Sequence, residues 1–276
     1  MGPLDVVKTP RMVRIFDDAI TAEALIAELM VGTVAEAVSH DISHAANQDI
    51  LVQQDFASSQ RITISTGSWS CAVLVNHLSR GSSADDILTA QPIRFGAAEP
   101  AGSVLSGGGG NDEIRGRAGW DILDGGDGED LLHGGNGRDI LTGGAGRDEL
   151  HGDFGWNTYR SERDGVCDLI AIKSDQFLNN WLYGQAGNNA DGSKCDIIEG
   201  LDGVDKIRII GVATSQLSFA ENISINGVTG IGIYGGGALE ALYTGGDLSL
   251  NQIASMTSGD ASTAAMTNQI NRYTTW

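Results

Sequence analysis

A large apolar residue recurs at every ninth position in one stretch of the chain. Between residues 107 and 160, six nine-residue units follow one another without an insertion. The eighth place of these units holds Ile114, Leu123, Leu132, Leu141, Leu150 and Tyr159. Alternating turns and short strands would bring all six side chains to one side, so the period predicts a flattened coil around an apolar core.

The stretches on either side show the shorter periods of ordinary secondary structure. Apolar runs and alternation before residue 99 predict strands at 13–16, 61–66 and 71–75. Good helix formers predict helices at 22–30, where Thr21 is the N-cap, and at 34–40. After residue 160 the pattern predicts strands at 168–172, 206–210, 230–234 and 239–243. The Ser- and Thr-rich tail from Ser255 onwards predicts loose order.

These patterns predict a mainly β protein in three regions. Residues 1–98 form a small mixed α/β region of unknown role, residues 99–160 the coiled repeat, and residues 161–276 a β-rich C-terminal flank. Within the flank, residues 200–208 look like a degenerate copy of the nine-residue unit.

The remaining places of the unit predict its turn. Gly stands at the first, second and fourth places of most units, and Gly adopts positive φ without a steric penalty, so the backbone can turn tightly there. Arg117 and Asp153 take the second place of their units, where a side chain restricts the turn. The sixth place holds Asp112, Asp121, Asp130, Asp139 and Asp148, with Asn157 in the last unit.

The chemistry of these turns favours a hard cation. Backbone carbonyls and carboxylates, without a set of His or Cys ligands, are the oxygen donors that suit Ca²⁺. The whole chain carries 36 Asp and Glu against 17 Lys and Arg, a formal charge of −19. This charge repels nucleic acids and anionic membranes, so we expect no nucleic-acid partner. Because no apolar run reaches the ~20 residues of a membrane span, we also expect no transmembrane segment.

The unit G-G-x-G-x-D-x-U-x, with U a large apolar residue, resembles the RTX (repeat-in-toxin) or hemolysin-type calcium-binding repeat. The resemblance implies a parallel β-roll with two units per coil and several Ca²⁺ ions between the turns of successive coils. Residues 196–207 are similar to the segment that caps such rolls. The implied ligands lie at the first, third and sixth places: Gly107, Gly109, Asp112, Gly116, Ala118, Asp121, Gly125, Asp127, Asp130, Gly134, Asn136, Asp139, Gly143, Ala145, Asp148 and Asn157.

The resemblance also implies export from a bacterium by type I secretion, with the mature protein secreted or held at the cell surface. Proteins of this family use an uncleaved C-terminal signal, which we place in residues 161–276. The first ten residues lack the apolar core of a cleavable signal peptide, in agreement with that route.

The repeat leaves the biological role open, because such a fold serves many functions. One hypothesis is a non-enzymatic structural protein that is surface-associated or self-assembling. The second is a small secreted enzyme with its activity in residues 1–98, and the third is a module that adheres to glycans or cell surfaces. Residues 1–98 are shorter than the protease, lipase and epimerase domains usually joined to these repeats, and they show no catalytic constellation. The first hypothesis is therefore favoured.

Two weaker patterns suggest catalytic chemistry. His40 and His44 stand one helical turn apart, and Ser70 or Cys71 with His77 suggests a nucleophile and a base. Neither pair has its remaining partners at a recognised spacing, so structural residues are the favoured interpretation of both.

Two further patterns each allow two interpretations. Trp120, Arg138 and Trp156 stand at the fifth place of alternate units and would form either a binding platform or a self-stacking ladder. Cys167 and Cys195 either form a disulfide in an oxidising compartment or stay reduced.

Overall fold

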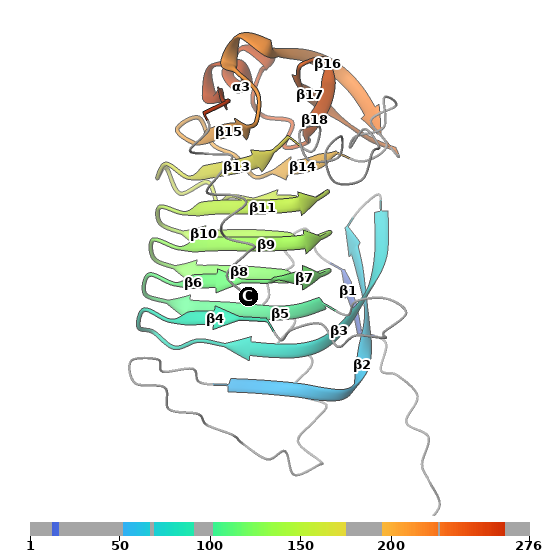
Figure 1. Cartoon of the computed structure of the whole chain (residues 1–276), viewed down its shortest axis with the longest axis vertical. Coiled ribbons are helices and arrows are strands. Elements are labelled where there is room, and N and C mark those ends of the chain that lie inside the picture. The colour runs from blue at the N-terminus through green and yellow to red at the C-terminus, as the bar shows by residue number, and fades with distance from the viewer. Residues whose placement is uncertain are drawn as a thin grey trace, which may run out of the picture.

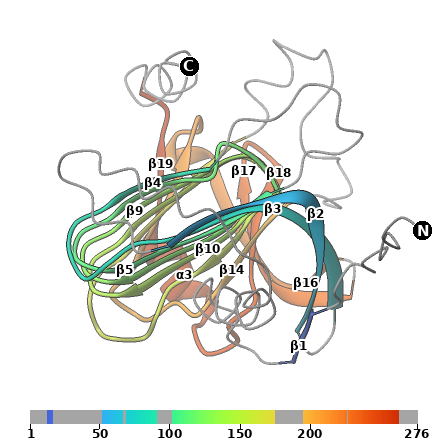
Figure 2. The same ribbon diagram turned by 90° about the horizontal axis from the view of Figure 1, so that it is seen from below.

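The computed structural model describes residues 13–16, 52–66, 69–90, 102–174, 195–225 and 227–262, with side chains from His77 onwards. Their architecture is mainly β, and most strands lie in parallel layers along one long axis (Figure 1). Seen along that axis, the layers superimpose as a flattened coil (Figure 2). Within the described part of the chain, no helix is both long and apolar enough to cross a membrane.

Successive coils are 18 residues apart, which means that two nine-residue units make one coil. In one sheet, β8 (Ile122–Asp127) pairs in parallel with β10 (Ile140–Ala145), and Leu123 lies opposite Leu141. In the other, β9 (Leu131–Gly137) pairs in the same way with β11 (Glu149–Gly155), and Leu132 lies opposite Leu150.

The first sheet runs past the repeat at both ends. Towards the N-terminus it continues through β5 (Gly102–Gly109), β3 (Trp69–Arg80), β2 (Val52–Thr66) and β1 (Val13–Phe16). Towards the C-terminus it continues through β12 (Thr158–Arg160), β14 (Asp196–Glu199), β18 (Ala238–Tyr243), β17 (Val228–Gly235) and β16 (Leu217–Ile225). The last three strands form an antiparallel meander.

The second sheet also extends beyond the repeat. Before β9 come β4 (Ile87–Thr89) and β6 (Glu113–Arg115), with the short β7 (Ala118–Gly119) paired beside β9. After β11 come β13 (Leu169–Lys173), β15 (Lys206–Ile210) and β19 (Thr257–Asp260). A short helix, α3 (Leu250–Met256), precedes β19 and buries Ile253 and Met256 against the core.

The main core of the described residues is an apolar column between the two sheets, with a smaller cluster of Cys195, Leu239 and Leu242 beside it. All six eighth-place residues of the repeat are fully buried, as the nine-residue period predicts. The column is extended at the N-terminal end by Leu88 and Leu105, and at the C-terminal end by Ile170, Ile198 and Ile207. Each such side chain contributes about 1.5–3 kcal/mol by leaving water.

The added coils belong to stretches in which the nine-residue spacing is lost. Leu88 lies opposite Ile114, 26 residues further on, because residues 90–101 stand between β4 and β5 in the chain. Ile198 lies opposite Tyr159 after 39 residues, and Ile207 opposite Ile170 after 37. Residues 200–208 were expected to be a degenerate unit, and their eighth residue, Ile207, does join the apolar column. The division into three domains remains a prediction, and both sheets run continuously past residues 98 and 160.

All seven predicted strands are confirmed, several with shifted bounds. The predicted strand at 13–16 is β1, those at 61–66 and 71–75 lie within β2 and β3, and the four after residue 160 correspond to β13, β15, β17 and β18. The predicted helices at 22–30 and 34–40 lie outside the described residues, together with His40 and His44. The prediction of loose order from Ser255 onwards is wrong for residues 255–260. Strand β19 pairs with β15, and Met256 and Thr257 are buried.

Candidate functional site

The sixth-place residues stack into two ladders, one along each edge of the coil. The first ladder consists of Asp86, Asp112, Asp130, Asp148, Asp168 and Asp205. The second ladder consists of Asp121, Asp139, Asn157 and Asp196, and it begins at Ser103. Since two units make a coil, odd and even units supply different ladders.

One oxygen of each side chain holds neighbouring coils together. The backbone N–H of Asp112 donates to Oδ1 of Asp130 at 2.7 Å, and the N–H of Asp130 donates to Oδ1 of Asp148 at 2.9 Å. In the second ladder the N–H of Asp121 donates to Oδ1 of Asp139 at 2.9 Å. These bonds fix the direction of each carboxylate, so its second oxygen has a defined position.

The second oxygen is the feature that indicates a ligand. Among the described residues, Oδ2 finds no hydrogen-bond donor in the following five residues, each at most 2% exposed: Asp112, Asp121, Asp130, Asp139 and Asp148. A buried carboxylate oxygen without a partner loses several kcal/mol of hydration, so a native structure supplies a donor or a cation.

Glycine makes room for a second oxygen at the same place. A side chain at Gly107 would clash with Oδ2 of Asp112 and with the carbonyl oxygen of Gly125 one coil further on. Gly125 stands in the same relation to Asp130 and to the carbonyl of Gly143. Gly116 and Gly134 repeat the arrangement in the second ladder, with Oδ2 of Asp121 and of Asp139. Carboxylate and carbonyl oxygens thus converge beside these four first-place glycines, and this donor set fits Ca²⁺.

The third-place residues lie differently. The side chains of Asp127, Asn136 and Ala145 are exposed, while Gly109 and Ala118 are half-buried. The carbonyls of Asp127 and Ala145 accept the N–H groups of the preceding coil, at 2.9 and 2.8 Å. A carbonyl has a second lone pair, so a role for these oxygens as ligands stays a prediction.

Burial makes the ladders unfavourable when they are ionised. Desolvation, reinforced by neighbouring carboxylates, raises the pKa of Asp112 to about 6, of Asp130 to about 7 and of Asp148 to about 8. Burial also raises the pKa of Asp121 and Asp139 well above the usual range. A cation between the rungs would offset this repulsion.

Three ladder residues escape the nine-residue pattern, namely Asp86, Asp168 and Asp196, whereas Asp205 is the sixth residue of the degenerate unit at 200–208. The signal that would have found them is a short one, an Asp followed two residues later by a buried Leu or Ile, as in Asp168-Leu-Ile170. Alone, three letters of this kind are too common to identify a coil.

The weaker candidates have separate outcomes. The Arg138 guanidinium lies over the Trp120 ring, 5.6 Å from its centroid, as expected for a stacked pair across coils. Within the described residues the thiols of Cys167 and Cys195 are both free, and burial raises the pKa of Cys195 to about 12. His77 is fully buried, while the side chains of Ser70 and Cys71 lie outside the described residues.

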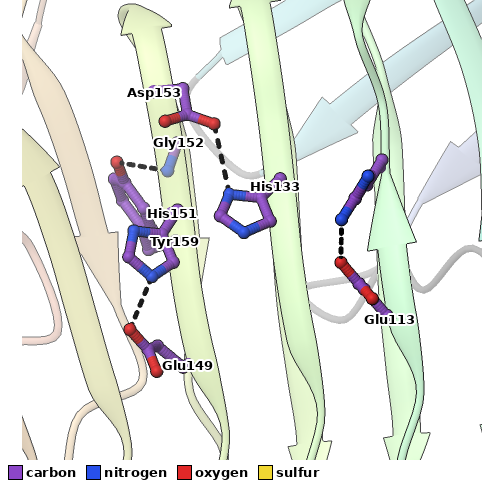
Figure 3. A network of polar contacts seen from close by, with 8 residues as sticks. Glu113, His133, Glu149, His151, Gly152, Asp153 and Tyr159 are labelled. Carbon is purple, nitrogen blue, oxygen red and sulfur yellow. Dashed lines mark hydrogen bonds and ion pairs between the residues drawn. The ribbon is translucent and has the colours of Figure 1, made fainter. Parts of the chain in front are cut away.

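A pair of stacked histidines, which the sequence did not single out, links β9 to β11. The rings of His133 and His151 are 4.7 Å apart, and each has a carboxylate beside it (Figure 3). Nδ1 of His133 lies 3.3 Å from Asp153, and Nε2 of His151 lies 2.6 Å from Glu149. The pair adds polar contacts between two coils outside the ladders.

Comparison with known protein families agrees with the geometry. Residues 102–132 and 133–164 match the RTX calcium-binding nonapeptide repeat (4 copies). No curated protein and no solved structure gave a significant match.

Proposed function

Because residues 102–164 are RTX calcium-binding nonapeptide repeats, we propose that this chain is an extracellular structural protein whose roll folds on binding Ca²⁺. In this proposal the protein is surface-associated or self-assembling and leaves a bacterium by type I secretion. Such repeats are typical of extracellular bacterial proteins exported by that route.

One observation carries the proposal: the row of buried Oδ2 atoms beside the first-place glycines, without a hydrogen-bond donor among the described residues. Without a cation, ordering so many glycines costs conformational entropy and brings ionised carboxylates together. At the millimolar Ca²⁺ concentration outside cells the ions compensate for both, and at the low concentration of a cytosol they do not. The repeat would therefore stay unfolded during export and fold outside.

The net charge bears on self-assembly. At a formal charge of −19, copies of the chain repel one another, and bound Ca²⁺ lowers that charge. An enzyme with its activity in residues 1–98 and a glycan or cell-surface adhesion module are the two alternative functions.

The test is circular dichroism and sedimentation velocity on the full chain in EGTA, in about 5 mM Mg²⁺ and in about 5 mM Ca²⁺, the concentration range of extracellular calcium modules. We expect β-sheet signal to increase with Ca²⁺ and not with Mg²⁺, which prefers a tighter octahedral shell. Assemblies larger than a monomer should form in Ca²⁺. Identical spectra in EGTA and Ca²⁺ would refute Ca²⁺-dependent folding, and a monomer in every condition would refute self-assembly.

A further inference from the structure

The middle and the C-terminal rungs of the ladders differ in what their second carboxylate oxygen contacts. In the middle, from Asp112 to Asp148, Oδ2 meets no donor within the described chain. In the coils that follow, the second oxygen of Asp196 accepts a hydrogen bond from a side-chain hydroxyl, and those of Asp168 and Asp205 both lie within hydrogen-bond distance of another hydroxyl, whose one proton goes to the nearer oxygen, that of Asp168.

Ser161 supplies this hydroxyl in the first ladder. Its Oγ lies 2.5 Å from Oδ2 of Asp168 and 3.3 Å from Oδ2 of Asp205, between two successive rungs. Oδ2 of Asp205 also accepts the backbone N–H of Asp202 at 2.8 Å. Ser161 is 5% exposed, so bulk water does not replace this contact. The serine oxygen thus stands between two carboxylates of neighbouring coils.

Tyr159 supplies the hydroxyl in the second ladder. Its OH donates to Oδ2 of Asp196 at 3.1 Å. The same oxygen accepts the backbone N–H of Gly152 at 3.1 Å (Figure 3). Gly152 is the first-place glycine of the last unit. A side chain at that position would clash with the Tyr159 hydroxyl, whereas at Gly134, one coil earlier, it would clash with Oδ2 of Asp139.

Asn157 adds a second obstacle to a cation at the same place. Its Oδ1 accepts the N–H of Asp139 at 2.9 Å, which leaves the amide nitrogen facing Gly152. An amide N–H₂ is a donor only and cannot coordinate a metal. The second ladder therefore presents a hydroxyl and an amide nitrogen where the preceding coil presents a carboxylate oxygen.

We propose that the hydroxyls of Ser161 and Tyr159 end the two Ca²⁺ columns, so that the coils beyond β12 are joined by hydroxyl–carboxylate hydrogen bonds and bind no ion there. This inference rests on the proposed Ca²⁺ binding of the middle coils. The coils beyond β12 have other sources of stability, since Ile170, Ile172 and Ile209 are at most 1% exposed and belong to the same core cluster as Ile253 and Met256 of α3.

The proposal has a consequence for the number of sites. Ca²⁺ binds oxygen at about 2.3–2.6 Å, close to the distance between the Ser161 oxygen and Asp168. Removing this hydroxyl leaves two carboxylate oxygens facing a space of atomic size. The variant Ser161→Ala should then bind one more ion than the wild type, whereas Ser161→Thr keeps the hydroxyl and should not.

The experiment counts bound Ca²⁺ per chain by calorimetric titration and by metal analysis after dialysis. Ser174→Ala is the matched control, because Ser174 also donates a buried hydroxyl to a carboxylate, at 2.9 Å to Glu240, outside both ladders. We expect a gain of about one ion in Ser161→Ala and none in Ser174→Ala or Ser161→Thr. Equal counts in Ser161→Ala and the wild type would overturn the inference while leaving Ca²⁺ binding intact. A wild type that binds no Ca²⁺ would instead refute the proposed function.

Hydrogen exchange of the wild-type chain tests the same idea without a substitution. In EGTA, peptides from 107–150 should exchange fast, while peptides covering β13 and β15 stay protected. Fast exchange of β13 and β15 in EGTA would overturn the inference. This measurement uses the wild-type chain, so it holds even if Ser161→Ala does not fold. In the second ladder, Tyr159→Phe combined with Asn157→Asp should likewise gain an ion, with Tyr243→Phe, which loses a hydroxyl bond to Asp247, as control.

Discussion

The coils from β6 to β11 and the coils around β13, β14 and β15 share one geometry but differ in their turns. Both stack in parallel around the apolar column, and both carry an Asp rung at the edge. The first set opens most of its units with Gly-Gly, whereas residues 161–210 contain no Gly-Gly pair. The coil therefore depends on the rung and the apolar residue, and the first-place glycine marks the places where oxygens converge.

The largest expected effect is a difference between two Asp rungs of the middle coils, Asp130 and Asp121, in the Ca²⁺ concentration needed for folding. Asp130 holds Asp112 through Oδ1, and its Oδ2 faces the carbonyl of Gly143, so it contributes to the gaps on both of its sides. Asp121 shares only the gap towards Asp139, since Ser103 stands on its other side. We expect Asp130→Ala to raise the Ca²⁺ midpoint for folding by tenfold or more, since losing about 1.4 kcal/mol is a factor of ten, and Asp121→Ala to raise it less.

Asp127→Ala provides the control for this comparison. It removes the same charge three residues from Asp130, at an exposed position, so the midpoint should change little. The midpoints are measured by Ca²⁺ titration followed by circular dichroism. A shift at Asp121 equal to or larger than that at Asp130 would contradict the arrangement of two gaps against one.

A smaller effect is expected from pH in the absence of metal. The folded coils hold protons on Asp112, Asp130 and Asp148 up to about pH 6, 7 and 8, whereas the unfolded chain releases them near 3.8. The resulting stability is fully present below pH 3.8 and is lost as pH rises through 6 to 8. In EGTA the β-sheet signal should therefore be larger at pH 5 than at pH 8. A β-sheet signal that does not change with pH, or that grows towards pH 8, would contradict this pH dependence.

The smallest effect concerns a turn in which the repeat departs from Gly. Arg117 takes the second place of its unit with φ +72°, in the left-handed region that costs a non-glycine residue about 1–2 kcal/mol. Arg117→Gly should stabilise the Ca²⁺-bound roll by up to about 1 kcal/mol, because the entropy of the new glycine offsets part of the relief. Urea unfolding in saturating Ca²⁺ measures the change. Arg115→Gly, in strand β6, should destabilise instead, and a stability gain there would show that the backbone argument is wrong.

Much of the repeat follows from the spacing of residues along the chain. Leu123, Leu132 and Leu141 are nine residues apart, and a coil of 18 residues brings every second one opposite the next. The same spacing brings Asp112, Asp130 and Asp148 into one ladder. The side chain at Arg117 was expected to restrict its turn; in the structure Arg117 adopts a positive φ, as the second-place glycines do.

The coils outside the repeat could not be predicted in this way. The steps from Leu88 to Ile114 and from Tyr159 to Ile198 are longer than one coil, because additional residues are inserted between the strands. An insertion leaves the pairing of strands intact but removes the period that sequence analysis depends on. Helix α3 and strand β19 were missed because the Ser- and Thr-rich composition of their segment hides two buried apolar side chains, Ile253 and Met256.

The sequence alone therefore determined the apolar column and the middle of both ladders, since these depend only on a local period that every unit repeats. Where the columns end was decided by the tertiary structure. Ser161 meets Asp205 across 44 residues, and Tyr159 meets Asp196 across 37. Whether a buried carboxylate oxygen faces a hydroxyl or an oxygen-lined space depends on which coils come to lie next to each other. The inserted residues remove that information from the spacing along the chain.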